Sequence, residues 1–186
     1  MVFQMIEVDV EEAYLLLHPR PVVLVVSLRE DGSPNVMACS WITPVSEEPP
    51  YIALAMWREN YSYQLIMRNK EFTVNIPGYE HVNQVWMAGT RSGRKVDKAK
   101  ILGFKFIKSS KLKTPYIDGC LAYLGCRLDK TVDIGEISLM IAEIVEAKAR
   151  KDLLVRGKWN LKKAKVLQHL GGKVFTYSEK TLWPSK

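Results

Sequence analysis

Short runs of apolar residues, many of them β-branched, dominate the first third of the chain, and this pattern predicts β-strands. Residues 21–28 are rich in valine and too short for a helix. The pair Asp31-Gly32 follows, and it favours a hairpin because glycine supplies the positive φ that tight turns need. Residues 35–41 can then pair back as a second strand. The sequence therefore predicts a β-hairpin near the N-terminus.

Two further strands are predicted before the middle of the chain. Residues 51–56 alternate small and large apolar side chains, and residues 71–76 form a second apolar run that ends at Pro77-Gly78. A loop precedes residues 51–56, and we place it at the prolines of this region, which are Pro44, Pro49 and Pro50.

The longest β signal lies in the second half of the chain. Residues 119–132 and 136–149 flank residues 133–135, which have the composition of a tight turn. Two strands of this length joined by a short turn form a long hairpin, which is typical of barrels. Connectors long enough for repeated βαβ units are scarce, so we predict one mainly antiparallel β-barrel.

A few short helices complete the expected fold. Residues 8–18 have apolar positions at helical spacing before two prolines, and Ser62 stands where a helix cap is expected. Residues 81–88 favour another short helix. Residues 161–172 have apolar residues at helical spacing and end in two glycines, so we predict a short helix or turn packed on the barrel.

Length and composition narrow the class of protein. The chain has 186 residues, of which 47% are apolar and 25% charged, values typical of one globular domain. No apolar run approaches the roughly 18 residues of a membrane span. The start of the chain is acidic and lacks an apolar signal core. We expect a single domain over residues 1–186, located in the cytoplasm and without a membrane partner.

The net charge of +7 raises the question of an anionic partner. Nine Lys or Arg residues fall within residues 91–113 and nine within 148–173, each run with one acid. These runs can form a solvated surface, bind nucleic acid or bind a phosphorylated ligand. Nucleic acid is disfavoured because few aromatic residues are interleaved with the charges.

A phosphate group needs only one or two cations with hydroxyl or amide donors. Arg58 precedes the expected helix start at Ser62, and residues 90–94 combine two hydroxyls, two cations and a glycine. Either segment could bind phosphate. A capped helix and a polar loop would account for the same residues.

Catalytic and metal-binding motifs are not found in the sequence. Its three histidines lie far apart, its three cysteines have no metal-ligand spacing, and it has neither a phosphate-binding P-loop nor a Rossmann glycine pattern. Cys39 lies among small residues of the second predicted strand, so we interpret it as a buried, inert thiol. We therefore expect no metal and no catalytic side chain.

Five segments in their order along the chain resemble the flavin reductase-like, FMN-binding split-barrel proteins, a group that includes flavoredoxins. These segments are PVVLVVSLREDGSPNVMACSW, WRENYSYQLI, FTVNIPG, AGTRSGRKVDK and the long hairpin through Gly135-Glu136. The resemblance spans residues 17 to 178. It implies a homodimer of six-stranded antiparallel split barrels with Greek-key topology, and FMN bound at or near the dimer interface.

The resemblance also implies which residues bind FMN. The second strand would line the flavin ring, the helix start near Arg58 would bind the phosphate, the end of the strand FTVNIP would lie under the flavin, and the basic loop would close over phosphate and ribityl. The implied cofactor-binding residues are Asn35, Met37, Ala38, Cys39, Ser40, Trp41, Arg58, Ser62, Tyr63, Asn75, Pro77, Thr90, Arg91, Ser92, Gly93, Arg94 and Lys98.

The implied activity is that of an FMN-dependent oxidoreductase that moves electrons through bound FMN. Many members that use NADH or NADPH have Gly-Asp-His at the turn of the long hairpin, whereas this chain has Gly135-Glu136-Ile137. The sequence therefore leaves the donor open between a nicotinamide and a protein or small molecule. The alternative function is a redox-inactive basic split barrel that binds nucleic acid or another polyanion.

Overall fold

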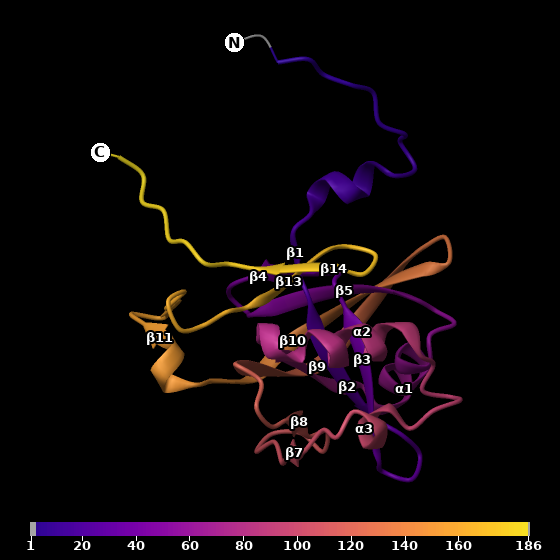
Figure 1. The fold of residues 1–186 in the computed structure, drawn as a ribbon. Helices are drawn as coiled ribbons and strands as arrows, with labels where there is room; N and C mark the ends of the chain where they lie inside the picture. The colour runs from indigo at the N-terminus through magenta and orange to yellow at the C-terminus, as the bar shows by residue number, and fades with distance from the viewer. Residues whose placement is uncertain (1–2, 186) are drawn as a thin grey trace.

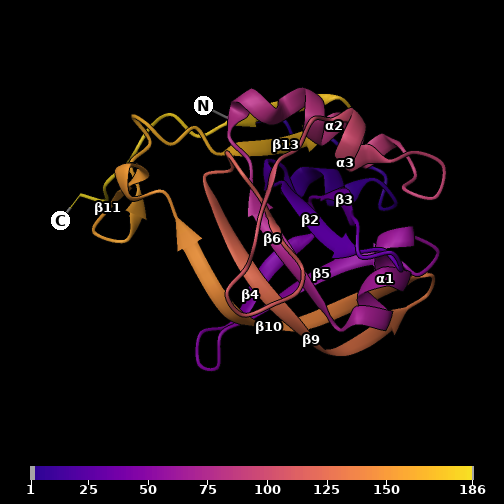
Figure 2. The ribbon, with the colours of Figure 1, turned by 90° about the horizontal axis from the view of Figure 1, so that it is seen from below.

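The computed structural model describes residues 3–185, and its main element is a curved antiparallel sheet of seven strands in the order β3-β2-β6-β9-β10-β5-β4 (Figures 1 and 2). Its strands are β2 (Val23–Leu28), β3 (Pro34–Cys39), β4 (Ile42–Ser46), β5 (Tyr51–Trp57), β6 (Glu71–Ile76), β9 (Ala122–Ile134) and β10 (Ile137–Ala149).

Smaller elements surround this sheet. The helices of the described residues are α1 (Tyr61–Asn69), α2 (Val82–Thr90) and α3 (Lys98–Ile101), and 3-10 turns lie at Ala13–Leu17, Tyr79–His81 and Lys151–Leu153. A second sheet has the order β1 (Arg20–Pro21), β13 (Leu167–Gly171) and β14 (Val174–Tyr177). Two short pairs are β7 (Phe106–Ile107) with β8 (Tyr116–Ile117), and β11 (Leu154–Val155) with β12 (Lys158–Trp159).

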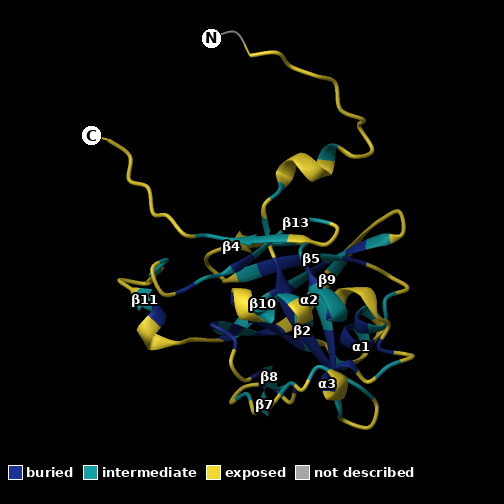
Figure 3. Cartoon of the chain, in the orientation of Figure 1, coloured by how far each residue is buried: buried dark blue, intermediate teal, exposed yellow. Residues whose placement is uncertain are grey.

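Strand β2 separates two apolar cores. Val23 and Val25 pack with side chains from β3, β5, β6, β9 and β10, which meet because the sheet curls around them. Val22, Leu24 and Val26 point to the other face and pack with residues of α2 and β13. Successive side chains of a strand point to opposite faces, so a strand buried on both sides needs the unbroken apolar run seen here (Figure 3).

The main elements predicted from the sequence are confirmed. Strands β2 and β3 form the first hairpin, β5 and β6 follow, and β9 and β10 form the long hairpin. Helix α2 contains residues 82–88 of the predicted segment 81–88, and the fold is mainly β as expected. Within residues 3–185, no helix is both long and apolar enough to cross a bilayer.

Two predictions near the N-terminus were wrong. Residues 8–18 form only the 3-10 turn Ala13–Leu17, which has no buried residue and therefore too little packing to stabilise a longer helix. In Figures 1 and 3 this exposed segment runs away from the body of the molecule. The predicted loop is confirmed at Pro49 and Pro50, which lie in the turn between β4 and β5, but the region around Pro44 is strand β4 rather than a loop. An edge strand tolerates proline because one side of its backbone has no partner strand.

Three other details differ from the sequence prediction. Ser62 lies inside α1 rather than at its cap, because the helix begins at Tyr61 and its cap position is Asn60. Residues 161–172 contain strand β13 instead of a helix, since pairing with β1 and β14 outweighs the helical spacing of the leucines. The main sheet has seven strands rather than six because β4 pairs with β5.

Candidate functional site

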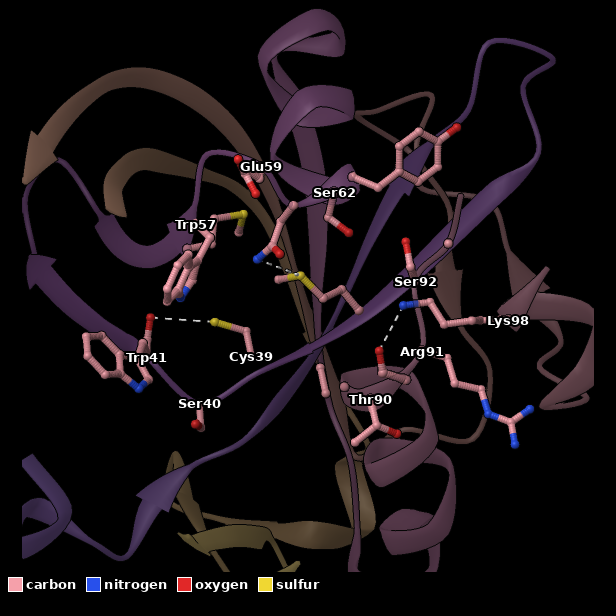
Figure 4. A pocket seen from close by; sticks show the side chains of 18 of the residues that line it. Cys39, Ser40, Trp41, Trp57, Glu59, Ser62, Thr90, Arg91, Ser92 and Lys98 are labelled. Carbon is pink, nitrogen blue, oxygen red and sulfur yellow. Dashed lines mark hydrogen bonds between the residues drawn. The ribbon is translucent and has the colours of Figure 1, made fainter. Parts of the chain in front are cut away.

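The candidate site is a pocket of about 400 Å³ formed where the end of β3 meets the end of β5, the start of α1, and the segment from α2 to α3. Figure 4 shows Trp41 and Trp57 at one side of this pocket, and Thr90, Arg91, Ser92 and Lys98 at the other. Its lining residues are Met37, Ala38, Cys39, Ser40, Trp41, Ala55, Met56, Trp57, Glu59, Asn60, Tyr61, Ser62, Ala88, Gly89, Thr90, Arg91, Ser92, Gly93, Arg94, Lys98 and Ile137.

Lys98 is a buried cation in the pocket wall. Its side chain is 3% exposed, and its Nζ donates a hydrogen bond to the carbonyl oxygen of Ala88 at 2.8 Å. Burial, together with repulsion from Arg29, lowers the pKa of Lys98 to about 8. A buried ammonium with a neutral partner and a positive neighbour is stabilised by any anion that enters the pocket.

Two arginines lie around one aromatic ring beside Lys98. The guanidinium carbons of Arg29 and Arg94 each lie 5.5 Å from the centroid of the Tyr61 ring. Arg94 also donates to the carbonyl oxygen of Glu59 at 2.9 Å. The Nε and Nη2 atoms of Arg29 are buried, and neither has a hydrogen-bond partner among residues 3–185.

These cations are not neutralised by carboxylates. Among residues 3–185, no ion pair involves Arg29, Arg91, Arg94 or Lys98, and Glu59 is the one acidic residue in the lining. Arg29 lies outside the lining but close enough to influence Lys98. This side of the pocket is therefore electropositive and suits a multiply charged anion.

The other side of the pocket is aromatic and apolar. Trp41 and Trp57 are 44% and 54% exposed, and small or aliphatic residues lie between β3, β5 and β10. The Trp41 ring contacts Tyr14 at a centroid distance of 5.7 Å and lies 5.3 Å from the Arg20 guanidinium carbon. A pocket with aromatic walls at one end and cations at the other fits a ligand with a planar ring and an anionic tail.

The buried side-chain amide of Asn35 lies behind the polar side of the pocket and donates hydrogen bonds to two hydroxyls. Asn35 is 1% exposed, and its Nδ2 donates to the hydroxyls of Ser62 at 2.9 Å and of Ser27 at 3.3 Å. Its Oδ1 has no hydrogen-bond partner in the part of the chain that the structure describes, and it lies so close to Gly93 that a Cβ added there would clash with it. Asn35 thus connects β2, α1 and the segment that follows α2.

Most of the site residues expected from the sequence come together in this pocket. Twelve of the seventeen line it, and these are Met37, Ala38, Cys39, Ser40, Trp41, Ser62, Thr90, Arg91, Ser92, Gly93, Arg94 and Lys98. Asn35 lies behind the wall, as described above. Burial raises the pKa of the Cys39 thiol to about 11, so this cysteine is a neutral part of the wall rather than a nucleophile.

Arg58 does not line the pocket, which corrects its expected place. Its guanidinium binds the turn between β9 and β10, with Nη1 3.3 Å from Oδ2 of Asp133 and Nη2 donating to the carbonyl oxygen of Gly135 at 2.9 Å. Its backbone N–H donates to the carbonyl oxygen of Glu136. Closeness in sequence to the helix start suggested a phosphate contact, but these partners hold the side chain on the hairpin.

Three other expected residues also lie elsewhere. Tyr63 packs against the core cluster inside the barrel, on a different face of α1 from Ser62. Asn75 is fully buried, where its amide donates to the carbonyl oxygen of Leu24 and accepts from the N–H of Ile117. Pro77 accepts a backbone hydrogen bond from Leu167. These residues support the fold rather than line the pocket.

Sequence reasoning missed several lining residues. Glu59, Asn60 and Tyr61 lie in the predicted WRENYS segment, so a closer reading of that turn could have found them. Ile137 carries no local signal, because only the packing of distant strands brings it to this pocket. The same holds for Arg29, which lies near Lys98 but outside the lining. The remaining lining residues outside the prediction are Ala55, Met56, Trp57, Ala88 and Gly89.

Comparison with known proteins identifies the family. The model of the flavin reductase like domain matches residues 15–163. The chain belongs to the flavin reductase-like family. This assignment agrees with the resemblance seen in the sequence. The matched residues include all the residues that line the pocket.

Relatives of this family member come from several organisms. A protein from Archaeoglobus fulgidus is 36% identical over 160 residues, covering 86% of this chain and 89% of its own. The crystal structure of flavoredoxin from Methanosarcina acetivorans is 26% identical with a TM-score of 0.84, covering 99% of this chain and 95% of its own. The FMN-binding protein from Thermus thermophilus, at 19% identity, 99% and 100% coverage and a TM-score of 0.83, shares the fold.

Proposed function

We propose that this protein is an oxidoreductase that binds FMN in the pocket between β3, β5, α1 and α2 and moves electrons through it. The observation that carries the proposal is the group of lining cations Arg91, Arg94 and Lys98, which has no carboxylate partner among residues 3–185. Figure 4 shows Arg91 and Lys98 on the side of the pocket opposite the two tryptophans. Membership of the flavin reductase-like family supports the same cofactor.

The residues present fit FMN. The pocket volume of about 400 Å³ lies within the range of about 300 to 1,000 Å³ that is usual for small-molecule sites. The hydroxyls of Ser62, Thr90 and Ser92 and the cations suit a phosphate and a polyol, while the tryptophan side suits a planar ring. Bound FMN would supply the redox chemistry, because its ring accepts and releases electrons.

The protein's own contribution is binding and orientation. Lys98 and the arginines would hold the phosphate by charge-assisted hydrogen bonds. Backbone groups of Met37, Ala38 and Ser40 at the end of β3 would face the ring, where fixed dipoles stabilise charge without reorganising. The buried thiol of Cys39 excludes water from this wall.

Purified protein tests the cofactor directly. We expect a flavin absorption spectrum, or its appearance on addition of FMN to flavin-free protein, together with a higher melting temperature because the ligand binds only the folded state. A protein that stays colourless and gains no stability with FMN would exclude the proposal.

The electron donor follows from an anaerobic titration of the FMN-loaded protein. Rapid bleaching of the flavin bands by NADH or NADPH marks a flavin reductase. Absence of bleaching by both marks a flavoredoxin-type carrier, which agrees with Ile137 at the hairpin turn, where many nicotinamide-using members have a histidine.

We further propose that the protein works as a homodimer. Trp41, Trp57 and Ile134 are large apolar side chains exposed on or near the pocket rim, and Ile137 pairs with both Trp57 and Ile134. A second copy would cover this apolar surface. Sedimentation analysis distinguishes a monomer from a homodimer, and a monomer at micromolar concentration contradicts the proposal.

A further inference from the structure

Residues 3–12 form an exposed arm that leads away from the body of the molecule (Figures 1 and 3). Every residue of this arm is exposed, and the part before Val10 belongs to no helix or strand. The side chains of Phe3, Met5, Ile6 and Val10 are each at least 79% exposed. Single exposed apolar residues are ordinary, but a run of them marks a surface that another surface covers.

The sequence of the arm has the pattern of a β-strand. Residues 6–11 read Ile-Glu-Val-Asp-Val-Glu, so apolar and acidic residues alternate without exception. Successive side chains of an extended segment point to opposite faces, and one face of the arm would therefore be apolar and the other would carry three carboxylates. The backbone of a lone strand lacks hydrogen-bond partners, and the edge of an existing sheet supplies them.

Strand β14 is the sheet edge that fits such a strand best. At the edges of the main sheet, β3 contacts helices α2 and α3, and β4 contains Pro44, which has no N–H to donate. Glu47 and Glu48 follow β4 and would repel the carboxylates of the arm. In the second sheet, β14 is an edge strand of four residues without proline, and each of them is at least partly exposed.

The charges around β14 complement those of the arm. Residues 1–19 contain four acidic residues and no lysine or arginine, whereas residues 162–180 contain five lysines and one acid, Glu179. Glu179 lies 3.9 Å from Nζ of Lys165. Lys173 is exposed directly before β14, and it forms no ion pair among residues 3–185. Complementary charge guides an acidic strand to this edge.

We propose that the arm of one copy of this chain adds as a strand to β14 of a second copy, with its carboxylates near the lysines around β14. In a twofold dimer the exchange is reciprocal, so each copy gives one arm and receives one. A second copy is the occupant because the arm leads away from its own body (Figure 1). The inference rests on the homodimer proposed above and is independent of FMN.

Cross-linking between two variants tests the contact. Val8→Cys in the arm and Val174→Cys at the start of β14 are co-expressed on chains with different tags and treated with a short bismaleimide. This reagent bridges nearby thiols without requiring an exact register. The native thiols do not interfere, because Cys39, Cys120 and Cys126 are 7%, 8% and 0% exposed. We expect a covalent dimer that contains both tags.

The matched control replaces β14 by the other exposed edge. Val45 is a residue of β4 and is 50% exposed, close to the 57% exposure of Val174. Co-expressed Val8→Cys and Val45→Cys should give little covalent dimer. Efficient cross-linking at Val45 with none at Val174 would place the arm on β4 and overturn the proposal.

Dimer affinity measured by sedimentation gives a second test. Deletion of residues 3–12 should weaken the dimer about tenfold or more, because burial of even one large apolar side chain accounts for that factor. Asp9→Lys and Lys173→Glu should each weaken it about twofold to fivefold at low salt, and together less than the product of the two. Lys105→Glu is the control, since Lys105 directly precedes β7, at the opposite end of the molecule from β14 (Figure 1).

The outcomes separate this inference from the proposals on which it depends. No link between Val8→Cys and Val174→Cys, a link within one chain when both cysteines are on it, or an unchanged dimer affinity after deletion of the arm would each overturn it. A dimer that persists without the arm leaves the homodimer intact, whereas a wild-type monomer contradicts the homodimer and the inference together. FMN binding is measured separately, and its failure would leave the cross-linking result unaffected.

Discussion

The side-chain amide of Asn35 donates a hydrogen bond to the hydroxyl of Ser62 at 2.9 Å, and both side chains are almost completely buried. The bond connects β3 to the first turn of α1. It fixes the position of a hydroxyl that lines the pocket, so Asn35 acts on a ligand through Ser62 rather than by contact.

Gly93→Ala should destabilise the protein, and removal of the Asn35 side chain should relieve part of that loss. An added Cβ would lie 2.1 Å from Oδ1 of Asn35, and overpacking of this kind costs about 1 to 3 kcal/mol. Asn35→Ala alone should also cost about 1 to 3 kcal/mol, because it leaves buried hydroxyls unpaired.

Chemical denaturation of the two single variants and the double variant measures this coupling. We expect the double variant to be more stable than the sum of the single losses predicts, by at least about 0.5 kcal/mol. Strictly additive losses would show that Gly93 and Asn35 are not in contact.

Arg94→Ala should weaken FMN binding by about tenfold to a hundredfold, the range for a hydrogen bond to a charged group. Arg58→Ala should leave FMN affinity unchanged, because the Arg58 guanidinium binds Asp133 and Gly135 outside the pocket. Titration of flavin-free protein with FMN, followed by flavin fluorescence, compares this matched pair. If FMN affinity fell more in Arg58→Ala than in Arg94→Ala, the phosphate would bind at the start of α1 instead.

FMN affinity should fall as the pH rises above about 8. The pKa of Lys98 is lowered to about 8 by burial and by Arg29, and a bound phosphate dianion favours the charged ammonium. The complex therefore holds a proton that the flavin-free protein loses above that pH. The loss of affinity is at most about tenfold per pH unit.

Lys98→Met should bind FMN more weakly at pH 7 and lose this pH dependence. Lys100→Gln is the control, since Lys100 is an exposed residue of the same helix α3. Affinities measured between pH 6.5 and 9.5 test the prediction, and an unchanged pH profile in Lys98→Met would show that another group titrates.

Glu146→Gln should lower the free energy of unfolding at pH 7 by about 2 to 3 kcal/mol. Burial opposes the charge of Glu146, but hydrogen bonds from Ser109, Ser110, Tyr123 and Lys148 outweigh it and hold its pKa well below the usual value. The contacts with Ser109 and Ser110 bind the loop between β7 and β8 to strand β10.

The same group gives stability a pH dependence. The folded-state pKa of Glu146 lies below the unfolded value, so its contribution is complete above about pH 5 and is lost as the pH falls. The free energy of unfolding, measured by chemical denaturation, should differ less between pH 7 and pH 4 for Glu146→Gln than for wild type. Glu143→Gln, on the same strand, is the control and should retain the wild-type difference.

Local patterns sufficed for the strands and hairpins. The valine run of β2, the turn at Asp31-Gly32 and the two long segments of β9 and β10 were all predicted, because pairing between sequence neighbours depends on nearby residues. The short helix or turn expected over residues 161–172 was wrong for Leu167–Gly171, which form strand β13, because β1, a distant segment, pairs with this strand.

The sequence by itself determined the family, the mainly β fold and most of the pocket, since the motifs in β3 and in residues 90–94 lie within continuous segments. Only the tertiary structure decided which cations face the pocket: it turned Arg58 to the β9–β10 hairpin and brought Arg29 next to Lys98. It also placed His169 and Phe175 beside the end of α2. The physical reason is that side-chain direction at these positions depends on contacts between segments far apart in the chain, which no local pattern encodes.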